Sequence, residues 1–256
     1  MLTIASFRKR FTELTTVRKV TWDALGFYCG NGMVIPFGTD TKVLSTIFES
    51  MSAPIICQIA EENGYVVEGA PQTVYPDFTL SHKEGRRKNR IAIDIKTTYR
   101  NQSKIKFTLG SYTSFLRDGK KNILYPYAEY EHHFVIGFLY SRCEETAAKV
   151  YVLDKGGKPT CPYKDVQYFI QEKYKIVGLS PGSGNTANIG SFPTSDIREL
   201  ESGNGPFASH GKEICDSYWR NYPRSGTPPY NSVVAFLAWI EKNKQVIISG
   251  SAAKTP

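Results

Sequence analysis

Asp77, Asp94 and Lys96 are the residues of this chain whose types and spacing best suit a chemical role. The first follows a proline in Tyr-Pro-Asp-Phe-Thr-Leu, and the other two lie in Ile-Ala-Ile-Asp-Ile-Lys. Carboxylates hold hard divalent cations, and an ammonium beside them can position or activate a water molecule. The set therefore suits metal-assisted phosphodiester hydrolysis. An Asp-x-Lys pattern alone is weak support, because charged residues are common on exposed strand faces.

Two short strands must position these side chains. Apolar residues alternate along Ile91–Lys96, which predicts a half-buried strand. Its three isoleucines would face the core, while its aspartate and lysine would share the opposite face. A second strand, Asp77–Leu80, follows Pro76, at an edge position that tolerates a missing N–H. The polar run Ser81–Arg90 between them predicts a turn that brings the two aspartates together.

Length and composition allow one large α/β domain or two small ones, since the chain has 256 residues, 41% of them hydrophobic. The net charge of +8 favours a polyanionic partner such as nucleic acid, although a merely soluble basic protein is equally compatible. Five scattered cysteines indicate neither a disulfide framework nor a zinc site. No apolar run approaches the roughly 18 residues of a membrane span, and the N-terminus is a poor signal peptide. We therefore expect a cytoplasmic protein without a membrane partner.

The remaining pattern predicts mainly helices at the two ends and strands between them. Residues 1–21 suit an amphipathic helix or an arm, and Trp22–Phe37 suits short strands and turns. Thr39 or Asp40 can cap a helix reaching Met51, with a second helical segment after Pro54. Glu49 lies off the apolar stripe of this helix, as expected for a solvated face. Further strands are expected at Tyr65–Val67, His133–Tyr140 and within Val166–Val177, and a closing helix at Asn231–Lys242.

Leu179–Gly190 is a glycine-rich segment, Leu-Ser-Pro-Gly-Ser-Gly-Asn-Thr-Ala-Asn-Ile-Gly. Its glycines allow close approach of the backbone to a ligand, and its Ser, Asn and Thr side chains can contact bases in a major groove. An ordinary surface loop or a phosphate-binding loop remains open. Nearby basic and hydroxyl residues suit phosphate contacts or a solvated surface. His132 and His133 would face opposite sides of a strand, so they suit packing and cannot chelate one metal together.

Several of these segments resemble the EcoRV-like type II restriction endonucleases, which have a PD-(D/E)xK nuclease core. The likeness runs in order from about Ile35 to Trp239. It is carried by Thr39-Asp-Thr-Lys-Val-Leu-Ser-Thr-Ile-Phe-Glu49, Tyr75-Pro-Asp77, Ile91-Ala-Ile-Asp-Ile-Lys-Thr-Thr-Tyr99, Lys104-Ile-Lys-Phe-Thr-Leu-Gly110, Tyr112-Thr-Ser-Phe115, Gly182-Ser-Gly-Asn-Thr-Ala-Asn-Ile-Gly190 and Tyr218-Trp-Arg-Asn-Tyr222.

The resemblance implies an α/β fold with a restriction-endonuclease-like mixed β-sheet core flanked by helices. It also implies a homodimer that needs Mg²⁺, no other small-molecule cofactor, and double-stranded DNA as substrate. Asp77, Asp94 and the accessory acidic residue Glu49 would be metal ligands, and Lys96 would position or activate the attacking water. The implied target is the palindrome GATATC, cut bluntly at its centre to leave 5′-phosphate and 3′-hydroxyl ends. The residues implied in DNA binding are Gly182, Ser183, Gly184, Asn185, Thr186, Asn188, Gln72, Thr97, Ser114 and Lys121.

Two departures from the family pattern concern DNA contacts. Ala70-Pro-Gln-Thr-Val74 keeps only Gln72 of a glutamine-rich minor-groove loop, and Ala187 replaces a threonine. We expect one endonuclease domain over 1–256, with a small dimerisation part around 22–36 and 145–160 and a disordered tail at 249–256. A non-specific or structure-directed repair nuclease on the same core, or a non-catalytic DNA-binding protein, remains an alternative.

Overall fold

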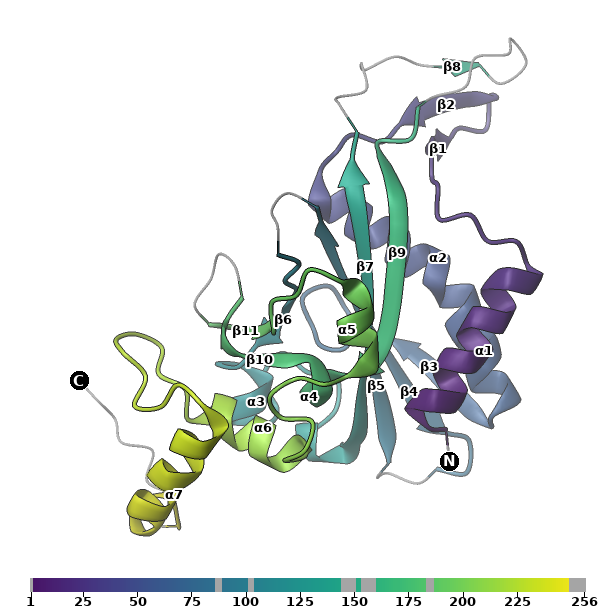
Figure 1. Ribbon diagram of the computed structural model, residues 1–256. Helices are drawn as coiled ribbons and strands as arrows, with labels where there is room; N and C mark the ends of the chain where they lie inside the picture. The colour runs from purple at the N-terminus through teal and green to yellow at the C-terminus, as the bar shows by residue number, and fades with distance from the viewer. Residues whose placement is uncertain are drawn as a thin grey trace.

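A five-stranded mixed sheet forms the centre of the computed structural model (Figure 1). The structure describes residues 2–85, 89–100, 104–143, 151–152, 160–182 and 187–248, with 244–248 described by their main chain alone. The strands, in their order across the sheet, are β3 (Tyr65–Gly69), β4 (Phe78–His82), β5 (Arg90–Tyr99), β7 (Tyr130–Arg142) and β9 (Tyr163–Glu172). β5 and β7 run parallel, and the other neighbours are antiparallel. With helices on both faces, this arrangement confirms the predicted fold class.

Both faces of the sheet are covered, so the prediction of a half-buried β5 was wrong. The helices are α1 (Ile4–Val17) and α2 (Thr41–Glu62) on one face, and α3 (Phe115–Asp118), α4 (Lys173–Ile176), α5 (Ile197–Ser202), α6 (Lys212–Arg220) and α7 (Val233–Ile248) on the other side (Figure 1). The isoleucines of β5 lie in the core formed with α1 and α2. Ala92 belongs to the second core, with Phe115 and Trp219. Asp94 is therefore buried, with 2% of its surface exposed.

Two small sheets flank the central one. β1 (Gly26–Tyr28), β2 (Met33–Pro36) and β8 (Tyr151–Val152) form the sheet at the top of Figure 1, and β10 (Val177–Pro181), β11 (Asn188–Ser191) and β6 (Thr108–Ser111) form the other. The first confirms the strands expected in Trp22–Phe37. The second brings the stem of the glycine-rich segment beside β6, which follows β5 along the chain.

The side chain of Asp40 caps α2 and accepts hydrogen bonds from the N–H groups of Lys42 and Val43, as predicted. The helix continues through Pro54 instead of being divided there, because Ile55, Ile56 and Ile59 extend the same buried face. By length and composition alone, α2 could cross a membrane. Its apolar residues lie in the core of the domain, and buried helices of globular proteins often pass the same test.

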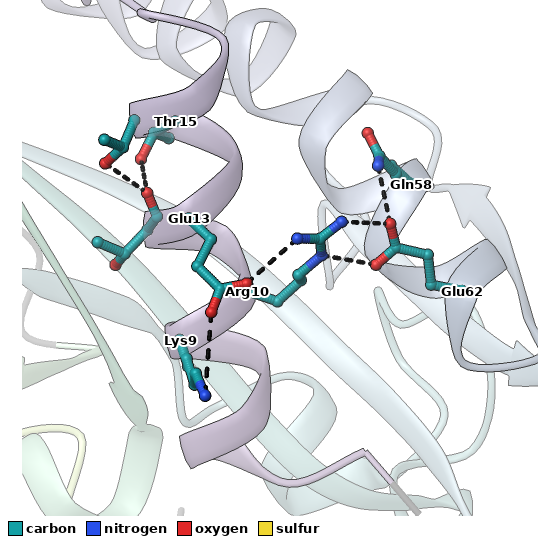
Figure 2. Close-up of polar contacts among 8 residues, drawn as sticks. Lys9, Arg10, Glu13, Thr15, Gln58 and Glu62 are labelled. Carbon is teal, nitrogen blue, oxygen red and sulfur yellow. Dashed lines mark hydrogen bonds and ion pairs between the residues drawn. The ribbon is translucent and has the colours of Figure 1, made fainter.

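Of the helix or arm expected at residues 1–21, the structure shows a helix, α1, which packs against α2. Figure 2 shows the guanidinium of Arg10 donating two hydrogen bonds of 2.7 Å to the carboxylate of Glu62 and one of 3.1 Å to Glu13. The hydrogen bond from Arg10 is the main reason why the pKa of Glu62 falls to about 2. On the same helix, the rings of Phe7 and Phe11 are fully buried.

The Phe7→Ala substitution tests how strongly this packing stabilises the fold. The Phe7 ring lies 5.5 Å from that of Phe134 on β7, measured between centroids, and it has no exposed surface. Its removal leaves a cavity, so we expect the free energy of unfolding to fall by about 3–5 kcal/mol. Urea unfolding followed by circular dichroism measures the change. Val17→Ala, at a position 77% exposed on the same helix, should change it by less than about 0.5 kcal/mol.

Candidate active site

The pairing of β4 with β5 places the two aspartates of the candidate site next to each other. Phe78 is opposite Ile93, so Asp77, just before β4, reaches the segment of β5 that carries Asp94. β4 begins at Phe78, one residue later than predicted. Asp77 precedes the strand, and its carboxylate bonds to the main chain of β5. One oxygen, Oδ2, accepts a hydrogen bond of 2.6 Å from the N–H of Ile95.

Lys96 connects the two carboxylates. Its ammonium donates to Oδ1 of Asp94 at 2.6 Å and to the carbonyl oxygen of Ile95 at 3.1 Å. The same nitrogen lies 4.0 Å from Oδ2 of Asp77. The structure thus brings together the three residues that the sequence singled out.

Burial and charge shift the pKa values of this cluster. Burial, reinforced by the charge of Asp94, raises the pKa of Asp77 to about 7, although Lys96 and the Ile95 N–H act in the opposite direction. Burial lowers the pKa of Lys96, but the two carboxylates together outweigh it and the net shift is upward. For Glu49 on α2, burial is the main cause of a raised pKa, with Lys96 opposing it. The cluster therefore contains carboxyl groups that lack full solvation.

Two pockets meet at Asp77 and Lys96. One, of about 480 Å³, is lined by Ser45, Glu49, Asp77, Ile95, Lys96, Thr97, Thr108, Gly110 and Asn188. The other, of about 270 Å³, is lined by Thr73, Val74, Tyr75, Asp77, Asp94, Lys96, Gly110, Ser111, Ser114, Phe115 and Asn122. Together they form a polar recess in which a substrate could contact the aspartates and the lysine at once.

The other predicted site residues fall into four groups. Glu49, Thr97, Asn188 and Ser114 line these pockets, and the Thr97 hydroxyl forms a 2.7 Å hydrogen bond with that of Ser45. Gln72 and Lys121 are exposed and line neither pocket, although their neighbours Thr73 and Asn122 do. Gly182 lies at the stem of the glycine-rich segment, where its N–H donates to the carbonyl oxygen of Asn188 at 2.9 Å. Ser183, Gly184, Asn185 and Thr186 lie outside the described residues.

Sequence reasoning missed several polar residues of the recess. They are Ser45, Thr73, Thr108, Ser111 and Asn122. Only Ser45 could have been found from the sequence. Residues four apart on a helix lie on the same face, so Ser45 lies on the same face of its helix as Glu49. The others come from separate loops and from β6, so no local pattern connects them with the aspartates.

The two aspartates fit a divalent cation. The second oxygen of Asp94, Oδ2, is buried and has no hydrogen-bond partner among the described residues. A buried carboxylate oxygen without a partner is costly, and a cation would satisfy it. Within the described part of the chain, no group of three or more His, Cys, Asp or Glu residues could hold a metal. A divalent cation held by the two aspartates would take its remaining ligands from water and substrate phosphate oxygens.

Comparison with known proteins agrees with this geometry. The family model described as restriction endonuclease EcoRV matches residues 18–241. The type II restriction enzyme EcoRV of Escherichia coli is 44% identical over 232 residues, which cover 88% of this chain and 93% of that enzyme. The matched region includes every residue of the recess. The chain therefore belongs to the EcoRV family of type II restriction endonucleases, which are site-specific deoxyribonucleases.

Proposed function

We propose that this endonuclease is a cytoplasmic homodimer that cuts both strands of the palindrome GATATC at its centre and requires Mg²⁺. The products would be blunt ends with a 5′-phosphate and a 3′-hydroxyl. The main support is the contact between Lys96 and Asp94 at 2.6 Å, with Asp77 held beside them by the Ile95 N–H. These three groups border a polar recess and can act together on one phosphodiester.

The roles of the side chains follow from their charges and positions. Asp77 and Asp94 hold the cation, and Glu49 adds an accessory carboxylate from α2. When bound, Mg²⁺ supplies positive charge that stabilises the developing charge on phosphate oxygens and makes a nearby water more acidic. Lys96 orients the attacking water and adds a second positive charge beside it.

Recognition of DNA involves both pockets and the glycine-rich segment. Gly182–Thr186 contacts base edges in the major groove, with Asn188 at the end of its stem. Thr97, Ser114 and Lys121 contact the phosphate backbone, and Gln72 lies near the minor groove. The hydroxyls that line the recess support this assignment, since such groups commonly bind phosphate oxygens.

We further propose that the chain is one endonuclease domain whose dimerisation part lies around 22–36 and 145–160. Of the second range, the structure describes 151–152, as β8, and residue 160. Phe27, Tyr28 and Ile35 on β1 and β2 are exposed by 57%, 67% and 44%. Next to them an apolar pocket of about 450 Å³ lies between β1 and α2. Exposed apolar groups this close together favour association, and identical half-sites favour two identical subunits.

The Phe27→Asp substitution is expected to convert the dimer into a monomer. A charge in the middle of the apolar contact would lose its solvation without gaining a partner. Sedimentation velocity measures the change in mass. Val66→Asp, at an exposed apolar position on β3, is the matched control and should remain dimeric. If Phe27→Asp sediments as a dimer, another surface forms the interface.

Metal removal separates the proposed enzyme from its alternatives. With EDTA present, we expect no cleavage of supercoiled plasmid, and Mg²⁺ in excess should restore it. Cleavage that persists in EDTA would contradict the metal-dependent mechanism. Restored cleavage that yields a smear instead of discrete fragments would favour the non-specific repair nuclease. Binding of DNA without cleavage under any divalent metal would favour the non-catalytic binding protein.

A further inference from the structure

Tyr75 bonds the segment that precedes Asp77 to strand β7 of the central sheet. It lies two residues before Asp77 and is buried. Its hydroxyl forms a 2.7 Å hydrogen bond with Nδ1 of His133 on β7. Its N–H donates to the carbonyl oxygen of Asn122 at 3.0 Å, and its carbonyl oxygen accepts from the N–H of Leu124 at 2.9 Å. Both the side chain and the backbone are therefore fixed just before the catalytic aspartate.

Ring packing reinforces these hydrogen bonds. The ring of Tyr75 stacks on that of Phe115, with centroids 4.3 Å apart, and lies 5.8 Å from the imidazole of His133. The imidazole in turn stacks on Tyr127 at 4.7 Å. Tyr75 and Phe115 both line the smaller of the two pockets, so this stack forms part of the wall of the recess, with His133 behind Tyr75 on β7.

His133 is buried with one ring nitrogen unpaired in the described part of the chain, which costs stability, so we look for a role beyond packing. Nε2 is buried and has no hydrogen-bond partner among the described residues. Burial, followed by the charges of Lys212 and Lys173, lowers the pKa of His133 well below its usual value. The imidazole is therefore neutral at neutral pH and lines neither pocket that contains Asp77. An unpartnered buried nitrogen is costly, and the only side chain that His133 bonds among the described residues is Tyr75.

We propose that His133 and Tyr75 are positioning residues for phosphodiester hydrolysis, and that their hydrogen bond and stacked rings fix the main chain that carries Asp77. The inference rests on the proposed role of Asp77. That carboxylate must face both the Ile95 N–H and the ammonium of Lys96, so a small displacement of its backbone would misplace it. Misplacement of a reacting group by about 1 Å can lower a rate by about 10²-fold.

Single substitutions can remove the hydrogen bond and leave the rest of the cluster in place. Tyr75→Phe keeps the stacked ring but removes the hydroxyl. His133→Leu removes the ring nitrogen that bonds to the Tyr75 hydroxyl, whereas His133→Asn keeps a polar atom near the position of Nδ1. Tyr230→Phe is the matched control, because the Tyr230 hydroxyl is also buried but donates to the carbonyl oxygen of Tyr218, at 2.9 Å.

Steady-state cleavage of a duplex containing the target, with thermal unfolding of each variant, tests the proposal. We expect kcat to fall at least tenfold for Tyr75→Phe and His133→Leu, with KM changed less than twofold. His133→Asn should recover to within threefold of the wild type, and Tyr230→Phe should keep the wild-type kcat. A merely structural role predicts that loss of kcat follows loss of thermal stability in all four variants.

Two results would overturn the proposal. One is a Tyr75→Phe protein with kcat within twofold of the wild type, and this variant remains informative if His133→Leu does not fold. The other is an equal loss of kcat in Tyr230→Phe. Asp77→Asn, measured in parallel, separates failure of the positioning role from failure of the proposed role of Asp77. If it is inactive while Tyr75→Phe is normal, only the positioning role fails; if it remains active, the assignment of Asp77 fails and the positioning role with it.

Discussion

The Asp94→Ala protein is expected to bind DNA but to cleave it at least about 10²- to 10³-fold more slowly than the wild type. Asp94 contributes one oxygen to Lys96 and another, buried and without a hydrogen-bond partner among the described residues, to the proposed cation. Its loss therefore removes a proposed metal ligand and the hydrogen-bond partner of the Lys96 ammonium together. Single-turnover cleavage of a target duplex measures the rate, and a gel-shift assay without added metal measures binding.

Misfolding must be separated from loss of chemistry, because Asp94 is on a buried strand. Asp94→Asn keeps the size of the side chain and should lose as much activity as Asp94→Ala. Thermal unfolding followed by circular dichroism identifies variants that remain folded. A folded Asp94→Asn protein with a cleavage rate within tenfold of the wild type would remove Asp94 from the metal site.

Replacement of Lys96 by alanine is expected to give a similar loss of cleavage for a different reason. The variant keeps both aspartates and should still bind the cation, which isothermal titration calorimetry measures directly. In the proposed mechanism it loses the positive charge at the attacking oxygen, so added Mg²⁺ should not restore the rate. Lys96→Arg tests whether charge alone is sufficient.

Two other outcomes for Lys96→Ala would assign this lysine a different role. If Lys96→Ala turns over at a near-normal rate, the ammonium has no catalytic role and serves only to neutralise Asp94. If metal binding is lost together with cleavage, Lys96 acts through the geometry of the carboxylates. Lys83→Ala is a useful control, because this lysine is exposed and lines neither pocket.

The parts of the site that could be predicted are those with a local sequence pattern. Alternating isoleucines located the strand that carries Asp94 and Lys96, and the preceding Pro-Asp located the neighbouring strand. Asp40 was predictable as a helix cap because a cap and its helix are adjacent in sequence. The mixed sheet followed from the family resemblance.

The unpredicted parts depend on contacts between residues distant in the sequence. Ala92 belongs to a core that includes residues more than a hundred positions later, such as Trp219 on α6, which the alternation along β5 cannot reveal. The same is true of the bond between Tyr75 and His133. Pro54 was misleading because the packing on both sides of it keeps α2 in one piece.

The most direct test of the central claim is digestion of plasmid DNA in Mg²⁺ by the purified protein, followed by sequencing of the product ends. The proposed function predicts discrete blunt fragments that end at the centre of GATATC, with 5′-phosphates. Discrete ends at another sequence would leave the nuclease class intact and contradict the assigned recognition loop. Intact plasmid after incubation with folded, DNA-binding protein would contradict the catalytic role of Asp77, Asp94 and Lys96.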